Sequence, residues 1–202
     1  MRKNLAWSKA QQVQIRLKKE AVLAEASALF NQKGYHATSL NDVAERLGLT
    51  KTALYYYVKN KNDLLYEAYS LALDEIDEAT REAEEKGKTG LEKICHYVRS
   101  EAFVHPQASA LLNEIDAIEN PSRRSSLQKR LRKANRQVEE WVSQGVADGS
   151  IEPCDAELSA RFVMGAFNWI PRWIGSSGRG MDEVTDYFVG LLTKSLTSES
   201  KR

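Results

Sequence analysis

The sequence predicts an all-α protein in which a small N-terminal three-helix unit is joined by a long helix to a helical C-terminal domain. Apolar residues recur at steps of three and four along most of the chain, which is the period of a helix, and about nine such segments can be counted. Glycine and proline fall where these segments would end or begin. No stretch of useful length alternates apolar and polar residues as a strand would, and no internal repeat is visible.

The first predicted helix covers 11–33, where apolar residues follow the helical period, and Gly34 is placed to cap its C-terminus. The polar composition of segment 1–13, which precedes the helical unit, favours a disordered tail. The alternative is a basic arm that reaches the minor groove of DNA. Its cations are Arg2, Lys3 and Lys9.

A short second helix is predicted over 40–47. Thr38 or Ser39 can cap its start, and Asp42 stands in the capping-box position after Ser39. Gly48 ends the helix and allows a sharp turn, because glycine adopts the left-handed conformation without a steric cost.

Thr50 can cap a brief third helix, on which Leu54, Tyr57 and Val58 are spaced to pack inward. Two helices joined by a tight glycine-containing turn form a helix-turn-helix motif. The outer face of the third helix then carries a cation, a hydroxyl and two phenols: Lys51, Thr52, Tyr55 and Tyr56. Together these groups are suited to a DNA groove, which is lined by phosphates. The alternative for each residue taken alone is ordinary solvent exposure or partial burial.

The charge of the chain is unevenly divided. The whole sequence has 29 basic and 28 acidic side chains, a net charge of +1. Residues 1–61 carry 11 − 4 = +7, and the remainder carries 18 − 24 = −6. This division predicts an anion-binding N-terminal unit attached to an acidic domain. Lys61 and Thr38 lie near predicted helix starts, where backbone N–H groups favour a phosphate.

A long fourth helix is expected from about residue 64 to Gly87, marked by apolar residues at helical spacing. Further helices are expected over 90–103, 106–118, 122–148, 154–174 and 181–197. The predicted organisation is an arm over 1–13, a DNA-binding domain over 14–62, an effector-binding and dimerisation domain over 63–198, and a tail over 199–202.

The segment GYHATSLNDVAERLGLTKTALYYYVKNKNDLL resembles the DNA-binding domain of TetR/AcrR-type bacterial transcriptional regulators. The resemblance covers about residues 14–66 and is specific, since both glycines, the Thr-Lys pair, Leu-Tyr-Tyr-Tyr and the closing lysine coincide. It implies operator contacts by Thr38, Thr50, Lys51, Thr52, Tyr55, Tyr56 and Lys61. Thr52 stands where the family often has glycine, and Lys59 where proline is common, which affects only the expected base preference.

A single short recognition helix reads few base pairs, so a dimer on a pseudo-palindromic operator is expected. The last two predicted helices carry more apolar surface than one core face needs, although a core within one chain could use part of it. The resemblance implies an intersubunit four-helix bundle there. The expected interface residues are Phe162, Ala166, Ile170, Val184, Phe188, Leu191 and Leu192.

The run ARFVMGAFNWIPRWIGSSGRG weakly resembles a TetR subgroup that responds to acyl-CoA thioesters or fatty acids. Polar groups among apolar ones in the C-terminal domain suit a ligand cavity, although ordinary hydrogen-bonded packing is the alternative. The candidate effector residues are His96, Arg99, Phe103, His105, Asn113, Trp169, Arg172 and Trp173. The basic run between Arg123 and Arg136 reads as a solvated helix face rather than a second DNA site.

Several classes are excluded or disfavoured. The chain has no Gly-rich phosphate loop, metal cluster or nucleophile–base motif, so no enzyme, cofactor or metal site is expected. The two cysteines, Cys95 and Cys154, are expected to be buried, reduced thiols of a cytoplasmic protein. No signal peptide or membrane-spanning run is visible.

The sequence therefore predicts a homodimeric repressor that is released from its operator by a small apolar or acyl-CoA-like effector. The alternative is an architectural or chromosome-associated DNA-binding protein on the same scaffold without an effector. These patterns do not specify the operator, the effector, whether the protein represses or activates transcription, or whether the arm contacts DNA.

Overall fold

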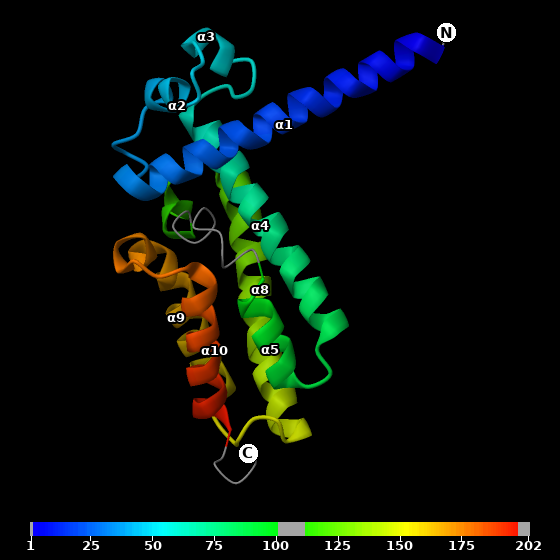
Figure 1. Ribbon diagram of the computed structural model, residues 1–202, viewed down its shortest axis with the longest axis vertical. Helices are drawn as coiled ribbons and strands as arrows, with labels where there is room; N and C mark the ends of the chain where they lie inside the picture. Colours follow the sequence, from blue (N-terminus) through cyan, green and yellow to red (C-terminus); the bar gives the residue numbers. More distant parts are fainter. Residues whose placement is uncertain (1, 101–111, 198–202) are drawn as a thin grey trace.

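The computed structural model describes residues 2–100 and 112–197. These residues form eight α-helices and one short 3-10 helix, and they contain no strand, which confirms the predicted all-α class. Figure 1 shows a small N-terminal head, made by the first three helices and the start of α4, above an elongated body. No described helix is long and apolar enough to cross a membrane.

Helix α1 spans Arg2–Lys33 as one continuous element, so the expectation of a disordered N-terminal tail is wrong for residues 2–13. No glycine or proline interrupts this stretch, and its packed second half supplies the nucleus that an isolated helix lacks. The apolar stripe that the sequence predicted is buried from Val22 to Phe30. Gly34 ends the helix at φ 83° and donates its N–H to the Phe30 carbonyl.

Helices α2 (Leu40–Arg46) and α3 (Lys51–Leu54) complete the head. The capping box is confirmed: Ser39 caps α2 and exchanges hydrogen bonds with Asp42. The hydrogen bonds of Asp42 with the backbone N–H and hydroxyl of Ser39 hold the pKa of its carboxyl below the usual value. Gly48 turns the chain between the two helices at φ 64°, as predicted.

Helix α4 spans Lys61–Lys86 and connects the head to the body (Figure 1). Asn60 caps its first turn by accepting the N–H of Asp63. One stripe of the helix, from Leu64 to Ala83, is buried against the rest of the molecule. A movement of α4 in the body is therefore also a movement of the head.

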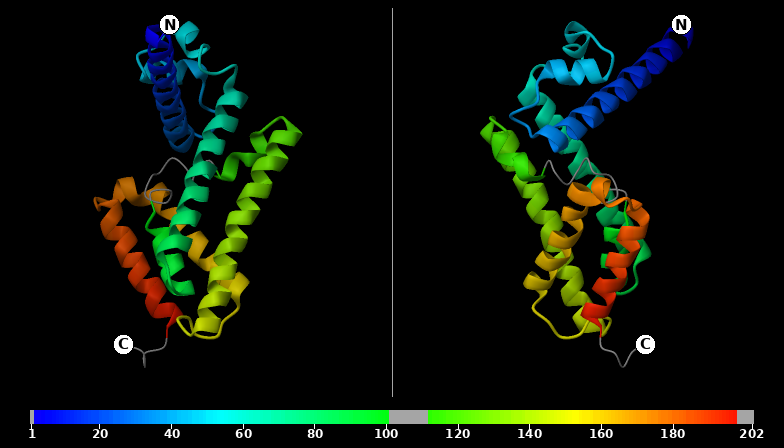
Figure 2. Two further views of the ribbon diagram at one scale, coloured as in Figure 1. Left: turned by 90° about the vertical axis from the view of Figure 1, so that its right-hand side faces the viewer. Right: turned by 60° about the vertical axis from the view of Figure 1, so that its left-hand side comes forward.

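The body contains α5 (Gly90–Val98), the 3-10 helix η1 (Leu112–Ala117), α8 (Pro121–Asp148), α9 (Ala156–Ser177) and α10 (Met181–Leu196). The bounds of the last three agree closely with those predicted, and prolines stand at or near the start of α8 and before α9. The helix predicted over 106–118 is described only from residue 112, where it is a 3-10 turn. Helix α8 lies against α4, α5 and α9, and its buried Trp141 packs edge-on against Tyr97 of α5. Figure 2 shows the same helices from two other directions.

Polar contacts join α4 and α8 at three levels. Arg123 pairs with Asp63 near the head, Arg130 pairs with Asp74 lower down, and Trp141 Nε1 donates to a carboxylate further along α4, Glu84. The basic run of α8 is therefore only partly a solvated face, because two of its arginines face α4. The prediction missed this because it considered α8 without its neighbour.

The two thiols differ in environment. Cys95 is half-buried on α5, and burial raises the pKa of its thiol. Cys154 is exposed in the connection before α9, so the expectation that both thiols are buried is wrong for Cys154.

Candidate nucleic-acid interface

The outer face of α3 and of the turn after it presents the side chains that the sequence predicted there, although α3 ends at Leu54, so that Tyr55 and Tyr56 lie in the turn. Lys51 and Thr52 are exposed, and Tyr55 and Tyr56 are 48% and 68% exposed. None of the four side chains has a hydrogen-bond or ion-pair partner among the described residues. The side of the head away from the body therefore carries an ammonium group, a hydroxyl and two phenols that are free to bind a ligand.

The opposite face of α3 anchors it. Leu54 is fully buried and Val58 nearly so, and Tyr57 packs against the same core, as predicted. Thr50 caps the helix by accepting the N–H of Ala53 at 3.1 Å. Because α3 has only four residues, this cap and the buried leucine determine the direction in which its outer face points.

Lys61 is the first residue of α4, as the sequence predicted, but its side chain is already engaged. Its Nζ donates to the His36 carbonyl at 3.2 Å and lies 4.3 Å from the centre of the Tyr35 ring. Burial lowers the pKa of this ammonium, against the attraction of nearby carboxylates. The Lys61 ammonium group therefore holds the loop before α2 against the start of α4. Lys61 itself is half-exposed to solvent.

The structure corrects the interpretation of Thr38. Its side chain is 2% exposed, and its hydroxyl donates to the carbonyls of Gly34 and Leu29 at the end of α1. Ser39, not Thr38, caps α2. Thr38 thus offers no free hydroxyl to a phosphate in this conformation and instead fixes the loop between α1 and α2.

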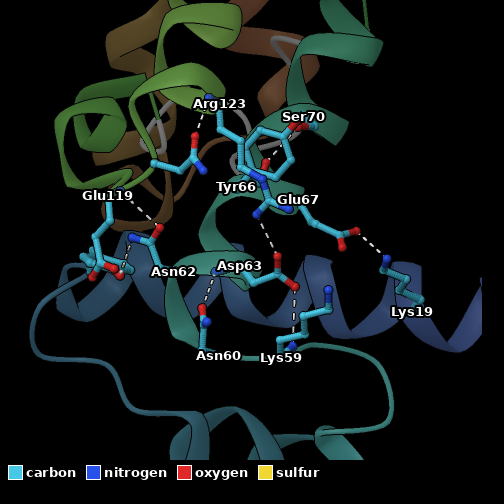
Figure 3. Close-up of polar contacts among 12 residues, drawn as sticks. Lys19, Lys59, Asn60, Asn62, Asp63, Tyr66, Glu67, Ser70, Glu119 and Arg123 are labelled. Atoms are coloured by element: carbon cyan, nitrogen blue, oxygen red, sulfur yellow. Dashed lines mark hydrogen bonds and ion pairs between the residues drawn. The ribbon is translucent and has the colours of Figure 1, made fainter.

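Sequence reasoning missed a joint between the head and the body (Figure 3). Asn62, in the first turn of α4, donates its side-chain amide to the Ala117 carbonyl at 2.7 Å and to the Tyr35 hydroxyl at 3.3 Å. Its side-chain oxygen accepts the Glu119 N–H at 3.1 Å. One amide therefore joins the head, α4 and the segment between η1 and α8.

Asp63 forms the second part of this joint (Figure 3). Its carboxylate lies 2.8 Å from the Arg123 guanidinium and also accepts the Lys59 N–H, and Arg123 lies over the Tyr66 ring. Burial alone would raise the pKa of Asp63, but these hydrogen bonds and the positive charge of Arg123 outweigh it, so the pKa is lowered. No local motif indicates an ion pair between residues 60 positions apart, so the sequence carried no signal for it.

The candidate effector residues do not gather into one enclosed site. His96 and Arg99 are exposed on α5, and Arg99 pairs with Asp186 of α10. Trp169 is exposed, and Trp173 packs beside the Phe188 ring. Phe103 and His105 lie outside the described residues, as do the side chains of Asn113 and Arg172.

The residues expected at a dimer interface divide into two groups. Ile170, Val184 and Leu192 are buried in the core of the chain itself, so they leave no surface for a partner. The half-buried Ala166 and Phe188 pack against that core, while Phe162 and Leu191 are exposed. Further exposed apolar side chains that were not selected lie on the same two helices: Leu158, Trp169 and Tyr187. The sequence period identified apolar helices correctly, but it could not say which face the rest of the chain would cover.

The comparisons with known proteins agree with this architecture. Residues 22–68 match the family "Bacterial regulatory proteins, tetR family", and residues 87–196 match "Tetracyclin repressor-like, C-terminal domain". The chain is 27% identical over 150 residues to the uncharacterized HTH-type transcriptional regulator YhgD of Bacillus subtilis, covering 73% of this chain and 78% of the relative.

Two solved structures extend the likeness over most of the chain. The ketosteroid transcriptional regulator KstR2 of Mycobacterium tuberculosis superposes with a TM-score of 0.79 at 20% identity, covering 90% of this chain and 96% of that one. AibR in complex with isovaleryl coenzyme A and operator DNA superposes with a TM-score of 0.70 at 26% identity, covering 87% and 97%. YhgD and KstR2 are named as transcriptional regulators, and AibR was solved with operator DNA. The chain belongs to the TetR family of bacterial regulatory proteins and is a DNA-binding transcriptional regulator.

Proposed function

We propose that this regulator is a homodimeric repressor that leaves a pseudo-palindromic operator when a small effector, an acyl-CoA or a related apolar carboxylate, binds its body. The observation that carries the DNA-binding part is the exposed face of α3 and of the turn after it, where Lys51, Thr52, Tyr55 and Tyr56 form no side-chain hydrogen bond or ion pair with the described residues. In this proposal α3 enters the major groove, the phenols and hydroxyls bind phosphates, and Lys51 or Thr52 reaches base edges.

The dimer surface that we propose is the outer face of α9 and α10. Phe162 is 61% exposed on α9, and Leu158 and Trp169 lie on the same side of that helix; Tyr187 and Leu191 lie on α10. Several large apolar side chains exposed together are uncommon on a monomer and typical of an interface. This assignment replaces the buried residues that the sequence suggested.

The effector chemistry is supported by a groove of about 420 Å³ between α8 and α9. Its lining includes Arg132, Arg136 and Arg161, of which Arg161 is paired with Glu157, and also Glu139, Met164 and Asn168. Guanidinium groups bind phosphates well, and Ala160 and Met164 offer apolar contacts to an acyl chain, so the lining fits a coenzyme A thioester better than a neutral ligand. AibR, which is similar in fold, was solved with isovaleryl coenzyme A.

The joint around Asn62 and Asp63 provides a route from the body to the head. Asn62 is held by Glu119 in the segment that leads into α8, and Asp63 by Arg123 at the start of α8, which forms one wall of the arginine groove. We infer that an effector which shifts α8 tilts the start of α4 and changes the separation of the two heads in the dimer. Operator DNA must then weaken effector binding by the same factor.

The DNA-binding proposal is tested with Tyr56→Ala and Lys51→Ala, using duplexes enriched by the wild-type chain from a random-sequence pool. Fluorescence anisotropy should show at least about tenfold weaker binding for each, since a phosphate or base contact contributes about 1–3 kcal/mol. Lys129→Ala, which removes an exposed cation from α8, is the matched control. Normal binding by both head variants would place the docking face elsewhere.

The dimer proposal is tested by sedimentation velocity. Phe162→Glu should yield monomers of unchanged helix content, whereas Tyr56→Glu, a substitution at a similarly exposed aromatic residue of the head, should remain dimeric. A dimeric Phe162→Glu variant would contradict the assigned surface.

The effector proposal is tested by titrating isovaleryl-CoA, free coenzyme A and isovalerate, followed by intrinsic tryptophan fluorescence. Arg132→Ala combined with Arg136→Ala should weaken isovaleryl-CoA binding at least about tenfold, because each charge-assisted contact contributes about 1.5–3 kcal/mol. Equal affinity of the thioester with and without operator DNA would refute the coupling while leaving the DNA-binding proposal intact.

A further inference from the structure

The first half of α1 extends beyond the head as a free helix. All described side chains from Lys9 to Lys18 are exposed, and the first link to another helix is the ion pair between Lys19 and Glu67 of α4. At 1.5 Å per residue, residues 2–18 extend about 25 Å from the packed part of the helix. The match to the TetR family begins only at residue 22, so this extension lies outside the family domain.

Most of the positive charge of the head lies on this extension. Residues 1–18 contain five basic residues and no acidic one, so they contribute +5 of the +7 that residues 1–61 carry. The recognition helix α3 contributes a single cation, Lys51. Within the described extension, Lys9 and Lys18 have no acidic partner, and Arg16 faces only Glu20 at 3.7 Å, with both side chains largely exposed.

The extension also points toward the side of the molecule that carries α3. In Figure 1 and in both views of Figure 2, the N-terminal end of α1 reaches the same height along the long axis as α3, above the body. It diverges sideways from α2 and α3 as it rises. If α3 enters the groove of a duplex, the extension would therefore lie beside the same duplex. It would face DNA outside the groove that α3 enters.

The apolar side chains that are described on the extension, from Lys9 onward, do not form a continuous stripe for another helix. Val13 and Leu17 share one face, but Ile15 lies on the opposite one, and all three are 40–50% exposed. A coiled-coil partner would need a continuous stripe at a heptad period, which is absent over the described part of this segment. Cations without acids fit a polyanion better than a protein partner.

We propose that the N-terminal extension of α1 is a second DNA-binding element, which contacts the phosphate backbone of DNA flanking the half-site occupied by α3. This inference rests on the proposed operator binding by α3 but concerns a different surface and different base pairs. The extension would supply affinity that depends on salt and not on sequence, because its cations release counterions from the phosphates they replace. Binding to phosphates would also reduce the electrostatic repulsion among the cations of the extension.

The test compares Lys9→Gln/Arg16→Gln/Lys18→Gln with a matched control, Lys88→Gln/Lys129→Gln/Lys133→Gln, which removes three exposed cations from the body. Two duplexes enriched by the wild-type chain are used: one trimmed to the core site, and one with about ten further base pairs, one helical turn, on each side. Affinity is measured by anisotropy over a series of salt concentrations, with circular dichroism and sedimentation to verify fold and dimer.

The wild type and the control should bind the flanked duplex at least about tenfold more tightly than the trimmed one, with a steeper salt dependence. The extension variant should lose this preference, and its slope of log affinity against log salt should fall by about two to five, roughly one for each phosphate that is no longer neutralised. Equal binding of both duplexes by the wild type, or an unchanged slope in the variant, would overturn the proposal.

Two further outcomes separate this inference from the others. If α3 does not bind DNA, Tyr56→Ala will not weaken binding to the trimmed duplex, whereas failure of the extension proposal alone leaves that effect in place. If the extension instead joins two copies of the chain, the extension variant will lose its dimer in sedimentation while the control keeps it, and the DNA proposal is refuted.

Discussion

Removal of the Arg123 guanidinium should reveal how strongly the joint holds the head to the body. Arg123 lies 2.8 Å from the Asp63 carboxylate, whose side chain is only 10% exposed, while that of Arg123 is 41% exposed. In Arg123→Met the carboxylate stays in a poorly solvated position at the start of α4 and keeps only the long hydrogen bond from the Lys59 N–H, 3.4 Å between N and Oδ2. The variant therefore loses the attraction between Arg123 and Asp63, and it leaves the Asp63 carboxylate without its cationic partner.

A fully buried pair broken in this way costs about 3–5 kcal/mol, whereas an exposed pair contributes about 0–1 kcal/mol. Because one partner is buried and the other half-exposed, we expect Arg123→Met to lower the free energy of unfolding by about 2 kcal/mol. For a chain of this size each kcal/mol shifts the Tm by about 2–4 °C, so the Tm should fall by about 4–8 °C. Lys129→Met removes one exposed cation from the same helix and should change the Tm by less than about 2 °C.

The pH dependence provides a second measurement. The folded-state pKa of Asp63 lies below its unfolded value, so the ion pair contributes stability that is fully present above the unfolded pKa, about 3.9, and is lost as the pH falls through the folded pKa. The difference in unfolding free energy between wild type and Arg123→Met should thus be constant from pH 7 to about pH 5 and shrink below pH 4.

A double-mutant cycle with Asp63→Asn, measured by urea unfolding at pH 7, isolates the pair from other effects of either substitution. The coupling energy should be about 1–2 kcal/mol, since contacting charged residues do not behave additively. A coupling energy near zero, or an Arg123→Met variant as stable as Lys129→Met, would refute the reasoning that the joint is an energetic link and not just a contact.

Three further substitutions test the fold around the site. In Gly90→Ala the new Cβ would lie 2.1 Å from the Trp141 carbonyl oxygen, so the unfolding free energy should fall by about 2–3 kcal/mol in urea, whereas Gly175→Ala, with open space at its Cβ, should be neutral or slightly stabilising. Gly48→Ala places a side chain at φ 64° and should cost about 1 kcal/mol by thermal unfolding; no loss would mean that the turn between α2 and α3 relaxes freely. Thr50→Ala removes the cap of α3 and should cost about 1 kcal/mol and weaken operator binding in anisotropy, whereas Thr50→Ser should preserve both.

The elements that local rules determine were predictable from the sequence. Ser39 with Asp42 specifies the start of α2, and Gly48 its end, because caps and left-handed turns depend on residues within one turn of helix. The inward and outward faces of α3 followed from spacing in the same way, with Leu54 and Val58 buried and Tyr56 exposed. The exposed face that we propose to bind DNA was thus predictable from residue spacing alone.

Features that depend on a distant partner were not predictable. The hydroxyl of Thr38 turns inward because the carbonyls at the end of α1 accept its hydrogen bond, and Ile170 is buried in the core of this chain and not at a contact with a second chain. Helix α1 begins at Arg2 because its packed half extends the helix into a segment whose composition alone reads as a tail. In each case the local pattern was compatible with two environments, and only the packing distinguished them.

The distribution of charge over the head separates two tasks that a DNA-binding protein must combine. Base selection needs donors and acceptors in fixed directions, and in the proposed complex Lys51 or Thr52 of α3 supplies them. Attraction to phosphates needs net charge but little orientation, and the extension provides five cations, from Arg2 to Lys18, ahead of the first acid of the chain, Glu20. Helix α1 is also tied to α4 by the ion pair between Lys19 and Glu67 and by the head core. A tilt of α4 would therefore displace α3 and the extension of α1 together. A small movement in the body would then weaken both of their contributions to operator affinity at once.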